Sequence, residues 1–300
     1  MSKVWKVGTR KSQLALWQAR ETAAALDRLG VAHSLVEIES SGDQNLTQPL
    51  YAMGIQGVFT KELDTALLNG QIDLAVHSLK DVPTQLASGT ELAGVLPRGK
   101  AKDILVYTQN PPGAEPTLIA SGSLRRRAQW LHRYPKDQFE NLRGNVQTRL
   151  KKLEESSWGG AIFAEVGLER VGLLPQKYQV LDWMIPAAAQ GAVGICIRER
   201  DHELKEIIQQ LNCESTWKAV QMERQFLRIL EGGCSAPIGV FAEPQGEGWK
   251  FKAGLFSTDG KDAIVVEETI APDQWQTKPK ELAEKVWASG GKAIISAIKN

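Results

Sequence analysis

The fold is decided by residues 4–30, which read VWKVGTRKSQLALWQARETAAALDRLG. Residues 4–8 have the apolar character of a short strand, and residues 14–29 have the spacing of an amphipathic helix that ends at Gly30. The same alternation continues with a strand at 35–40, a helix at 61–68 and a strand at 72–76. This order predicts a parallel sheet with helices on its faces.

A second unit of the same kind begins near Asp103. Its strands are expected at 104–107, 118–120 and 161–164, and its helices at 124–132 and 146–153. After Asp201 the pattern changes to helices at 203–211 and 216–230, strands at 239–242, 249–255 and 263–269, and a last helix at 280–298. Strands bracketed by helices are typical of a small α+β domain.

We therefore predict three domains. The first is an α/β domain made of residues 1–97 with 192–211, and the second is an α/β domain at 98–191. The third, at 212–300, is a smaller α+β domain with an antiparallel sheet. A crevice is expected between the first two, because ligands of open α/β sheets bind beyond the carboxyl ends of the strands.

The net charge of the chain is only +1, from 36 Lys and Arg against 35 Asp and Glu. This balance conceals a basic segment at residues 121–152, in which nine basic residues stand against two acidic ones. The segment carries +7 and the rest of the chain −6, so we expect an anion near its arginines.

Other sequence signals point to the reducing cytoplasm. No run of about 20 apolar residues, the length of a membrane span, is present. The three cysteines, Cys196, Cys213 and Cys234, have no framework spacing, and the four histidines and three cysteines are too scattered for a zinc site. We expect a cytoplasmic protein without disulfides, metal or membrane contact.

Two motifs in the first unit stand where strands are expected to end. Residues 8–12, GTRKS, join a strand to a helix, where Ser12 is a good N-cap and Arg10 can grip a carboxylate or phosphate. Residues 77–83, HSLKDVP, place Lys80 beside Asp81, which suits an anion next to a proton-transfer carboxylate. Ordinary turns with a surface arginine or an ion pair explain the same residues.

The basic segment has the same design. Residues 121–126, SGSLRR, again join a strand to a helix, with Arg125 and Arg126 in the first turn. Positive charge there opposes the helix dipole by about 0.3–1 kcal/mol per residue, and a bound anion would offset that cost. Residues 143–149, RGNVQTR, repeat the arrangement with Asn145 as the expected cap. A solvated basic face remains the alternative.

Cys234 differs from the other cysteines in its surroundings. It follows two glycines that end the preceding helix, so it is expected on a loop that a bulky adduct can reach. Burial as a small apolar residue is the alternative, and it suits Cys196, in the apolar run 193–197, better.

Six motifs follow one another along the chain: GTR with SQLA at 8–15, HSLKDVP at 77–83, SLRR at 123–126, RGNVQTRL at 143–150, QGAVG at 190–194 and EGGCSAPIG at 231–239. Their order resembles that of the porphobilinogen deaminase (hydroxymethylbilane synthase) family. The resemblance extends over nearly the whole chain.

The resemblance implies two domains like the halves of a periplasmic binding protein, and a third that carries a cofactor. It implies an enzyme that joins four porphobilinogens head to tail, releases ammonia and frees hydroxymethylbilane by hydrolysis. A dipyrromethane made of two substrate units is the implied primer, held as a thioether on Cys234. The implied partners are porphobilinogen and the growing pyrrole chain, without nucleic acid or membrane, and the implied state is a monomer.

The motif positions also imply roles for single residues. Asp81 matches the catalytic carboxylate, which would stabilise the cationic azafulvene left when ammonia departs. The implied cofactor contacts are Cys234, Lys80, Asp81, Ser123, Arg125 and Arg126. The implied substrate-binding residues are Arg10, Ser12, Lys61, Arg143, Arg149, Arg170 and Gln190. Several guanidinium groups suit this ligand because every pyrrole carries an acetate and a propionate.

The chain departs from the family pattern at a few positions. It has Gln56 for a common Lys, ASG at 120–122 for Gly-Thr-Ser, Glu165 for a small apolar residue, Ala189 for Gly and Ala236 for a β-branched residue. We expect Gln56 to remove a cationic contact and Glu165 to weaken the positive field locally. None of these positions is Asp81, Cys234 or a main arginine.

Two other function classes compete with the enzyme. A non-catalytic, two-lobed anion-binding module explains the arginines but not the Gly-Gly-Cys loop or the third domain. An RNA-binding protein would use residues 121–152, but the aromatic residues there are only Trp130, Tyr134 and Phe139. The mass of the intact protein separates the first alternative from the enzyme, because only the enzyme carries a covalent dipyrromethane.

Overall fold

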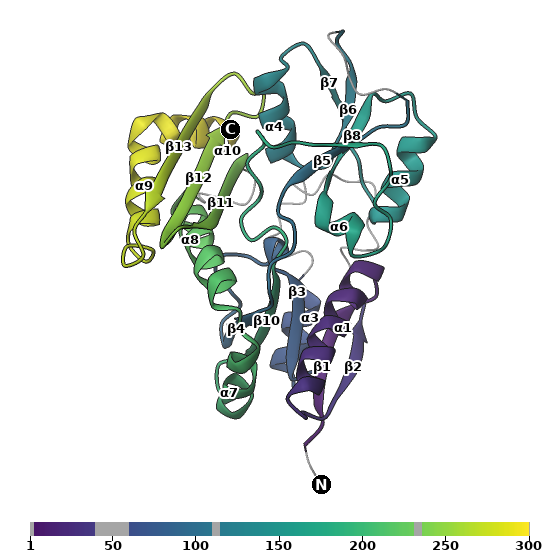
Figure 1. The fold of residues 1–300 in the computed structure, drawn as a ribbon, viewed down its shortest axis with the longest axis vertical. Coiled ribbons are helices and arrows are strands. Elements are labelled where there is room, and N and C mark those ends of the chain that lie inside the picture. The colour runs from purple at the N-terminus through teal and green to yellow at the C-terminus, as the bar shows by residue number, and fades with distance from the viewer. Residues whose placement is uncertain (1–2, 40–59, 110–114, 231–235, 300) are drawn as a thin grey trace. The chain divides into compact units, whose positions relative to one another are not determined.

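The computed structural model describes residues 3–39, 60–109, 115–230 and 236–299 (Figure 1). The described residues form two compact units: 3–39, 60–99 and 191–217 belong to the first, and 100–109, 115–190, 218–230 and 236–299 to the second. The sequence positions of Gln56 and Cys234 lie outside the described residues. The division into three domains stays a prediction.

The first unit is built on a five-stranded sheet in the order β2-β1-β3-β10-β4. Its elements are β1 (Trp5–Arg10), α1 (Gln13–Arg28), β2 (His33–Ile38), α3 (Lys61–Leu68), β3 (Leu74–Ser78), the single-turn η2 (Leu79–Asp81), β4 (Thr90–Val95), β10 (Val193–Arg198) and α7 (His202–Leu211). Helices cover both faces. α1 and α7 share one buried apolar cluster with the sheet, and α3 shares another.

The parallel pairing predicted for the strands of residues 4–76 is confirmed, but the sheet also contains two antiparallel pairings that the sequence did not indicate. β1 pairs in parallel with β2 and with β3, as the alternation indicates. β10, however, runs antiparallel to both β3 and β4, between which it lies. The alternation of residues 4–76 could not include β10, because that strand belongs to a segment that returns to this unit at residue 191.

The second unit contains another five-stranded sheet, in the order β7-β6-β8-β5-β9. Its elements are β5 (Asp103–Val106), β6 (Leu118–Ala120), α4 (Leu124–Arg133), β7 (Gln138–Glu140), α5 (Val146–Glu154), β8 (Gly160–Ala164), α6 (Glu165–Glu169) and β9 (Tyr178–Val180). β6 is parallel to β7 and β8, whereas β5 is antiparallel to β8 and β9. Successive residues of β5 alternate between the cluster under α5 and α6 and the cluster under α4.

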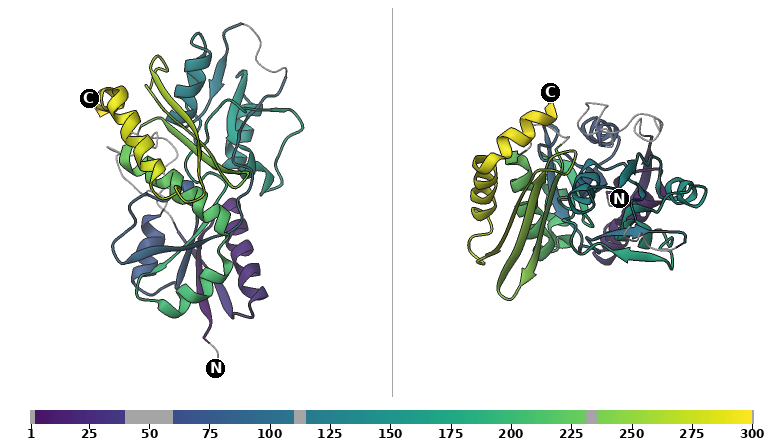
Figure 2. Two further views of the ribbon diagram at one scale, coloured as in Figure 1. Left: turned by 60° about the vertical axis from the view of Figure 1, so that its left-hand side comes forward. Right: turned by 90° about the horizontal axis from the view of Figure 1, so that it is seen from above.

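The same unit holds the predicted antiparallel sheet, with β11 (Ile238–Gln245), β12 (Gly248–Phe256) and β13 (Ala263–Ile270) as neighbours in sequence order. One face packs on α8 (Glu214–Leu230) and α9 (Lys278–Val286) through a cluster that includes Phe226 and Phe251. The other face meets α4, through Ala128 and Phe256. Helices therefore lie on both sides of this sheet, as the view from above in Figure 2 shows. The predicted class of two α/β sheets and a small antiparallel α+β part is confirmed.

The last helix was expected to run without a break from 280 to 298. Instead, α9 is followed by a distorted turn, η3 (Trp287–Gly291), and by α10 (Lys292–Lys299). Gly290 adopts φ 109°, a backbone conformation outside the helical region that glycine tolerates. Two adjacent glycines thus interrupt the helix, which the apolar spacing alone did not indicate.

Candidate active site

The candidate residues of the first unit stand at one edge of its sheet. β1 and β3 are parallel neighbours, with Val7 opposite Leu74 and Gly8 opposite Ala75. The segments that follow these strands therefore leave from the same edge, the usual ligand side of an open α/β sheet. Arg10 ends β1, while Lys80 and Asp81 lie in η2, directly after β3. Arg10 and Lys80 are half-buried and Asp81 is exposed.

Ser12 has the local role that the sequence predicts. Its Oγ accepts a hydrogen bond from the backbone N–H of Ala15 at 3.3 Å and so caps α1. The cap satisfies one of the free donors at the start of the helix and leaves others for an anion. Lys61 begins α3 and is exposed.

Sequence reasoning assigned no role to His77, which lies three residues before Lys80. The imidazole is 5% exposed, and its Nε2 has no hydrogen-bond partner among the described residues. Burial, helped by the positive charge of Arg10, lowers the pKa of His77 to about 4. The ring is therefore neutral at physiological pH, and Arg10 lies close enough to affect its charge.

The candidate residues of the second unit also share one edge. β7, β6 and β8 are adjacent and parallel, so their carboxyl ends lie side by side. Ser121 to Arg126 follow β6, Arg143 follows β7, and Arg170 follows β8 and the short α6. Three segments that are separate in sequence therefore deliver basic side chains from the same side of one sheet.

The start of α4 is built as the sequence predicts. The Oγ of Ser123 accepts the backbone N–H of Arg126 at 3.4 Å, and the Oγ of Ser121 accepts that of Ser123 at 3.3 Å. A hollow of about 170 Å³ opens there, lined by Ser121, Gly122, Ser123, Leu124, Arg127, Phe139, Glu140 and Asn141. Hydroxyl groups and a helix N-terminus make it suitable for an anionic group.

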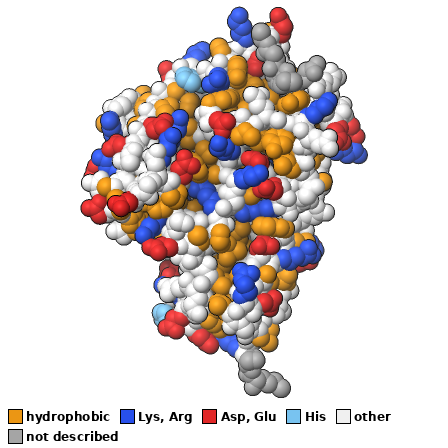
Figure 3. Space-filling view, in the orientation of Figure 1, with side chains coloured by type: hydrophobic (Ala, Val, Ile, Leu, Met, Phe, Trp, Pro, Cys, Tyr) orange, Lys and Arg blue, Asp and Glu red, His pale blue; other side chains and the backbone are white. Residues whose placement is uncertain are grey.

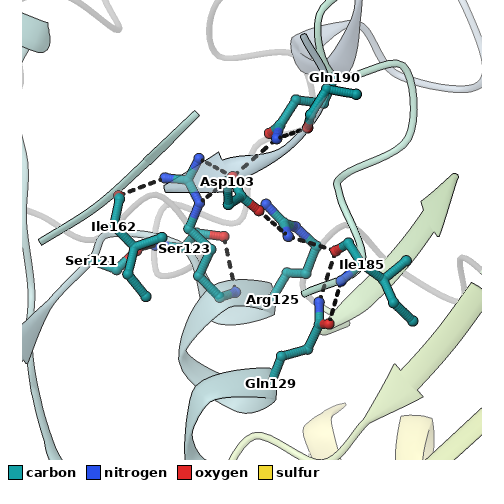
Figure 4. Close-up of polar contacts among 10 residues, drawn as sticks. Asp103, Ser121, Ser123, Arg125, Gln129, Ile162, Ile185 and Gln190 are labelled. Atoms are coloured by element: carbon teal, nitrogen blue, oxygen red, sulfur yellow. Dashed lines mark hydrogen bonds and ion pairs between the residues drawn. The ribbon is translucent and has the colours of Figure 1, made fainter. Parts of the chain in front are cut away.

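Arg125 and Arg126 are buried rather than exposed, at 7% and 6%. Both guanidinium groups bind the carboxylate of Asp103, the first residue of β5, as Figure 4 shows. Sequence reasoning missed Asp103. The sequence indicates only that two adjacent arginines need a counter-charge, because acidic residues directly before apolar runs also occur at Asp73 and Asp262.

The electrostatics of this cluster are dominated by burial and by the three charges themselves. Burial alone would raise the pKa of Asp103, but Arg125 and Arg126 more than offset it, so the pKa lies well below its ordinary value. For Arg125, burial lowers the pKa, and Asp103 opposes the shift. Asp103 is therefore a carboxylate at physiological pH.

Some side chains of the second basic motif, residues 143–149, make hydrogen bonds within the motif itself. Asn145 caps α5 as predicted, accepting the N–H of Thr148 at 2.9 Å. The Nε of Arg149 donates to the carbonyl of Gly144 at 2.7 Å. Arg143 is 5% exposed, and burial lowers its pKa.

Gln190 and Glu165 lie in buried polar contacts. The Nε2 of Gln190 donates to the carbonyl of Ala101 at 2.6 Å and to Asp103 at 2.9 Å. Glu165 was expected to weaken the positive field; Lys100 lies 2.8 Å from its carboxylate and 3.1 Å from that of Glu169, so one positive charge faces two negative ones. Both side chains therefore have polar partners within the protein.

Of the other sequence candidates, Cys196 is buried in β10 at 2% exposure, as expected. Basic and acidic side chains lie interspersed on the face of the molecule drawn in Figure 3, so no continuous basic surface is visible there. Among the described residues no helix is long and apolar enough to cross a membrane. The same residues contain no group of three or more potential metal ligands.

Comparison with known proteins supports the sequence resemblance. Residues 5–206 match the family model "Porphobilinogen deaminase, dipyromethane cofactor binding domain", and residues 217–288 match "Porphobilinogen deaminase, C-terminal domain". The chain is 37% identical to the porphobilinogen deaminase of Pelobacter propionicus, over 98% of this chain and 96% of that protein. It is 42% identical to the chloroplastic porphobilinogen deaminase of Oryza sativa subsp. japonica, over 88% of this chain and 77% of that protein.

Solved structures with a related arrangement are more distant. A periplasmic substrate-binding protein of an ABC transporter from Coxiella burnetii overlaps with a TM-score of 0.44 at 13% identity, over 71% of this chain and 94% of that one.

Proposed function

Since this chain belongs to the porphobilinogen deaminase family, we propose that Asp81 is its catalytic carboxylate and that Cys234 carries its dipyrromethane. The reaction is the head-to-tail condensation of four porphobilinogens with loss of ammonia, followed by hydrolytic release of hydroxymethylbilane.

The buried arginines carry the proposal. Arg125 and Arg126 bring two positive charges into the interior against the single negative charge of Asp103. A net positive charge is costly to bury without an anion. A dipyrromethane, with an acetate and a propionate on each ring, supplies carboxylates of the kind this cluster lacks. The residues present therefore fit the group.

We assign the dipyrromethane contacts accordingly. They are Arg125, Arg126, the hydroxyl of Ser123, Lys80 and Asp81. The thioether is assigned to Cys234, whose surroundings lie outside the described residues. When bound, the group supplies a pyrrole with a free α-carbon that attacks the incoming substrate.

Asp81 has the chemistry that the substrate requires. Departure of ammonia from porphobilinogen leaves a cation that a nearby carboxylate stabilises. The same carboxylate can hold the proton of a pyrrole N–H during bond formation. Asp81 is exposed and directly follows Lys80, whose ammonium group adds positive charge for substrate carboxylates.

The remaining assignments concern substrate binding. Arg10, Arg143, Arg149 and Arg170 are proposed to bind the acetate and propionate groups of substrate and of the growing chain. Ser12 is proposed to act through the capped N-terminus of α1, Lys61 as an exposed cation, and Gln190 through its contact with Asp103. The protein is proposed to work in the cytoplasm as a monomer. Light scattering of the purified protein would test the oligomeric state.

The deciding experiment is the mass of the intact, freshly purified protein. The proposal expects an increase equal to two porphobilinogen units less two ammonias, and expects it to vanish in Cys234→Ser but not in Cys213→Ser. A non-catalytic two-lobed receptor predicts the unmodified mass. Retention of the adduct in Cys234→Ser would overturn the assignment of the thioether to that residue.

A further inference from the structure

We propose that Asp103 is a positioning residue for the dipyrromethane site, whose carboxylate orients the Arg125 and Arg126 guanidinium groups for the carboxylates of the ligand. This inference rests on the proposed roles of the two arginines. It concerns a residue that none of the family motifs quoted above contains.

Asp103 lies at the centre of the contacts drawn in Figure 4. Its Oδ2 accepts the Nη1 of Arg125 at 2.7 Å. Its Oδ1 accepts the Nε and Nη2 of Arg126 at 3.0 and 2.8 Å. Asp103 is fully buried, so these charge-assisted hydrogen bonds are not weakened by water.

The two arginines are held differently. Each of the three nitrogens of Arg126 donates to the protein, since its Nη1 also binds the carbonyl of Ile162 at 2.9 Å. Arg125 uses only Nη1, which binds Asp103 and the carbonyl of Ile185 at 2.7 Å. In the described part of the chain, the Nε and Nη2 of Arg125 make no hydrogen bond. This edge can take a carboxylate in a bidentate contact.

The framework around Asp103 is itself fixed. Gln129, one turn after Arg125 on α4, donates to the carbonyl of Ile185 at 2.9 Å and accepts its N–H at 2.8 Å. Gln190 donates to Asp103 from the opposite side of the cluster. β5 and Gln190 thus fix the position of Asp103. Asp103 and the backbone carbonyl of Ile185 fix the position of Arg125.

The charge count separates positioning from ordinary stabilisation. A buried ion pair that served stability alone would be balanced, because an uncompensated buried charge is destabilising. Here one carboxylate serves two guanidinium groups, so the cluster keeps one positive charge. Asp103 holds both side chains in place and still leaves that charge for a ligand anion.

Two substitutions separate the charge of Asp103 from its size. Asp103→Asn keeps the size but removes the charge. Its amide N–H donors would also face the N–H donors of the two guanidinium groups. Asp103→Glu keeps the charge but adds a methylene to a packed interior. A role in packing alone predicts that Glu is the worse replacement. The positioning role predicts that Asn loses dipyrromethane loading although the variant stays folded, whereas Glu keeps it.

The control is an arginine–carboxylate contact of the first unit. Arg198 donates to Asp73 at 3.0 Å and to two backbone carbonyls at 2.7 Å, and it also lies 2.7 Å from a carboxylate oxygen of Asp201. Asp73→Asn removes one of these two carboxylate charges, away from the proposed ligand contacts. It should lower the melting temperature and leave loading unchanged.

The readouts are the loaded fraction by intact mass and the melting temperature. We expect Asp103→Asn to reduce the loaded fraction about tenfold or more, the scale of one lost charge-assisted contact, and Asp103→Glu to retain most of it. Equal loading in the two variants, or loss in Glu but not in Asn, overturns the proposal. So does an Asn variant that fails to fold while Glu folds, because Asp103 would then be required for the fold itself.

A further variant, Arg125→Met, keeps this inference distinguishable from the proposed function. Normal loading of Arg125→Met would refute the assignment of Arg125 as a cofactor contact. Loss of loading there, together with normal loading of Asp103→Asn, would refute only the role of Asp103.

Discussion

The ammonium group of Lys100 lies 2.8 Å from a carboxylate oxygen of Glu165, whose side chain is 7% exposed. Lys100 also contacts Glu169 at 3.1 Å, and its hydrogen bonds to Glu165 and then to Glu169 raise its pKa. Glu165 stands where the family commonly has a small apolar residue. Burial of the Glu165 carboxylate therefore depends on Lys100 as its counter-charge.

The first prediction follows from this pair. Lys100→Ala should lower the melting temperature by several degrees, because it leaves the Glu165 carboxylate buried without its cation. The double variant Lys100→Ala, Glu165→Ala should recover most of that loss. Differential scanning calorimetry of the single and double variants measures the coupling. If the double variant is no more stable than Lys100→Ala, the pair does not interact as described.

The second prediction concerns Asp81. Asp81→Asn should fold, because the side chain is exposed, and should keep the dipyrromethane, because the Asn amide retains an oxygen that accepts a pyrrole N–H; its kcat should fall by about 10²–10⁴, the usual contribution of a positioned acid–base group. Steady-state formation of hydroxymethylbilane measures the effect. Asp27→Asn, an exposed carboxylate on α1 of the same unit, is the matched control and should keep full activity. Near-normal turnover of Asp81→Asn would refute the catalytic role.

Periodicity predicted local elements well and long-range pairing poorly. The helix at 61–68 and the strand at 118–120 have the predicted bounds, and Ser12, Ser123 and Asn145 cap their helices as expected. These features depend on neighbouring residues. The antiparallel placement of β10 does not, since it is set by a segment that returns from elsewhere in the chain.

The candidate site shows the same division. The sequence indicated that Arg125 and Arg126 need an anion, because positive charge opposes the helix dipole there. It could not distinguish an anion supplied by the protein from one supplied by a ligand. Asp103 supplies part of it, from a strand that begins 22 residues before Arg125. A single acidic residue in an apolar strand has no periodic signature, so only the structure pairs the two.

The third prediction separates capping from ligand binding. Ser123→Ala and Asn145→Ala each remove a helix N-cap, so each should cost about 1 kcal/mol of stability in urea unfolding. Only Ser123→Ala should also reduce the fraction of chains that carry dipyrromethane, because only Ser123 is a proposed contact of that group. Intact mass measures this fraction. Equal loading of the two variants would leave Ser123 with a capping role alone.

The last prediction concerns the acid stability of the protein and His77. The folded pKa of His77 is about 4, below its ordinary value of 6.5, because the ring is buried and lies near Arg10. The unfolded chain therefore binds this proton more readily than the folded one, and stability should fall as the pH drops from 6.5 towards 4. The full effect is roughly 3 kcal/mol at the acid end of this range.

His77→Gln should flatten that decline, whatever its effect on stability at neutral pH. Urea midpoints measured between pH 7 and 5 are the best readout, because carboxylates with a lowered pKa, such as Asp103, lose their contribution only below about pH 5. His202→Gln, at the exposed start of α7, keeps His77 and should retain the decline of the unsubstituted protein. An unchanged slope in His77→Gln would mean that another group takes up the proton.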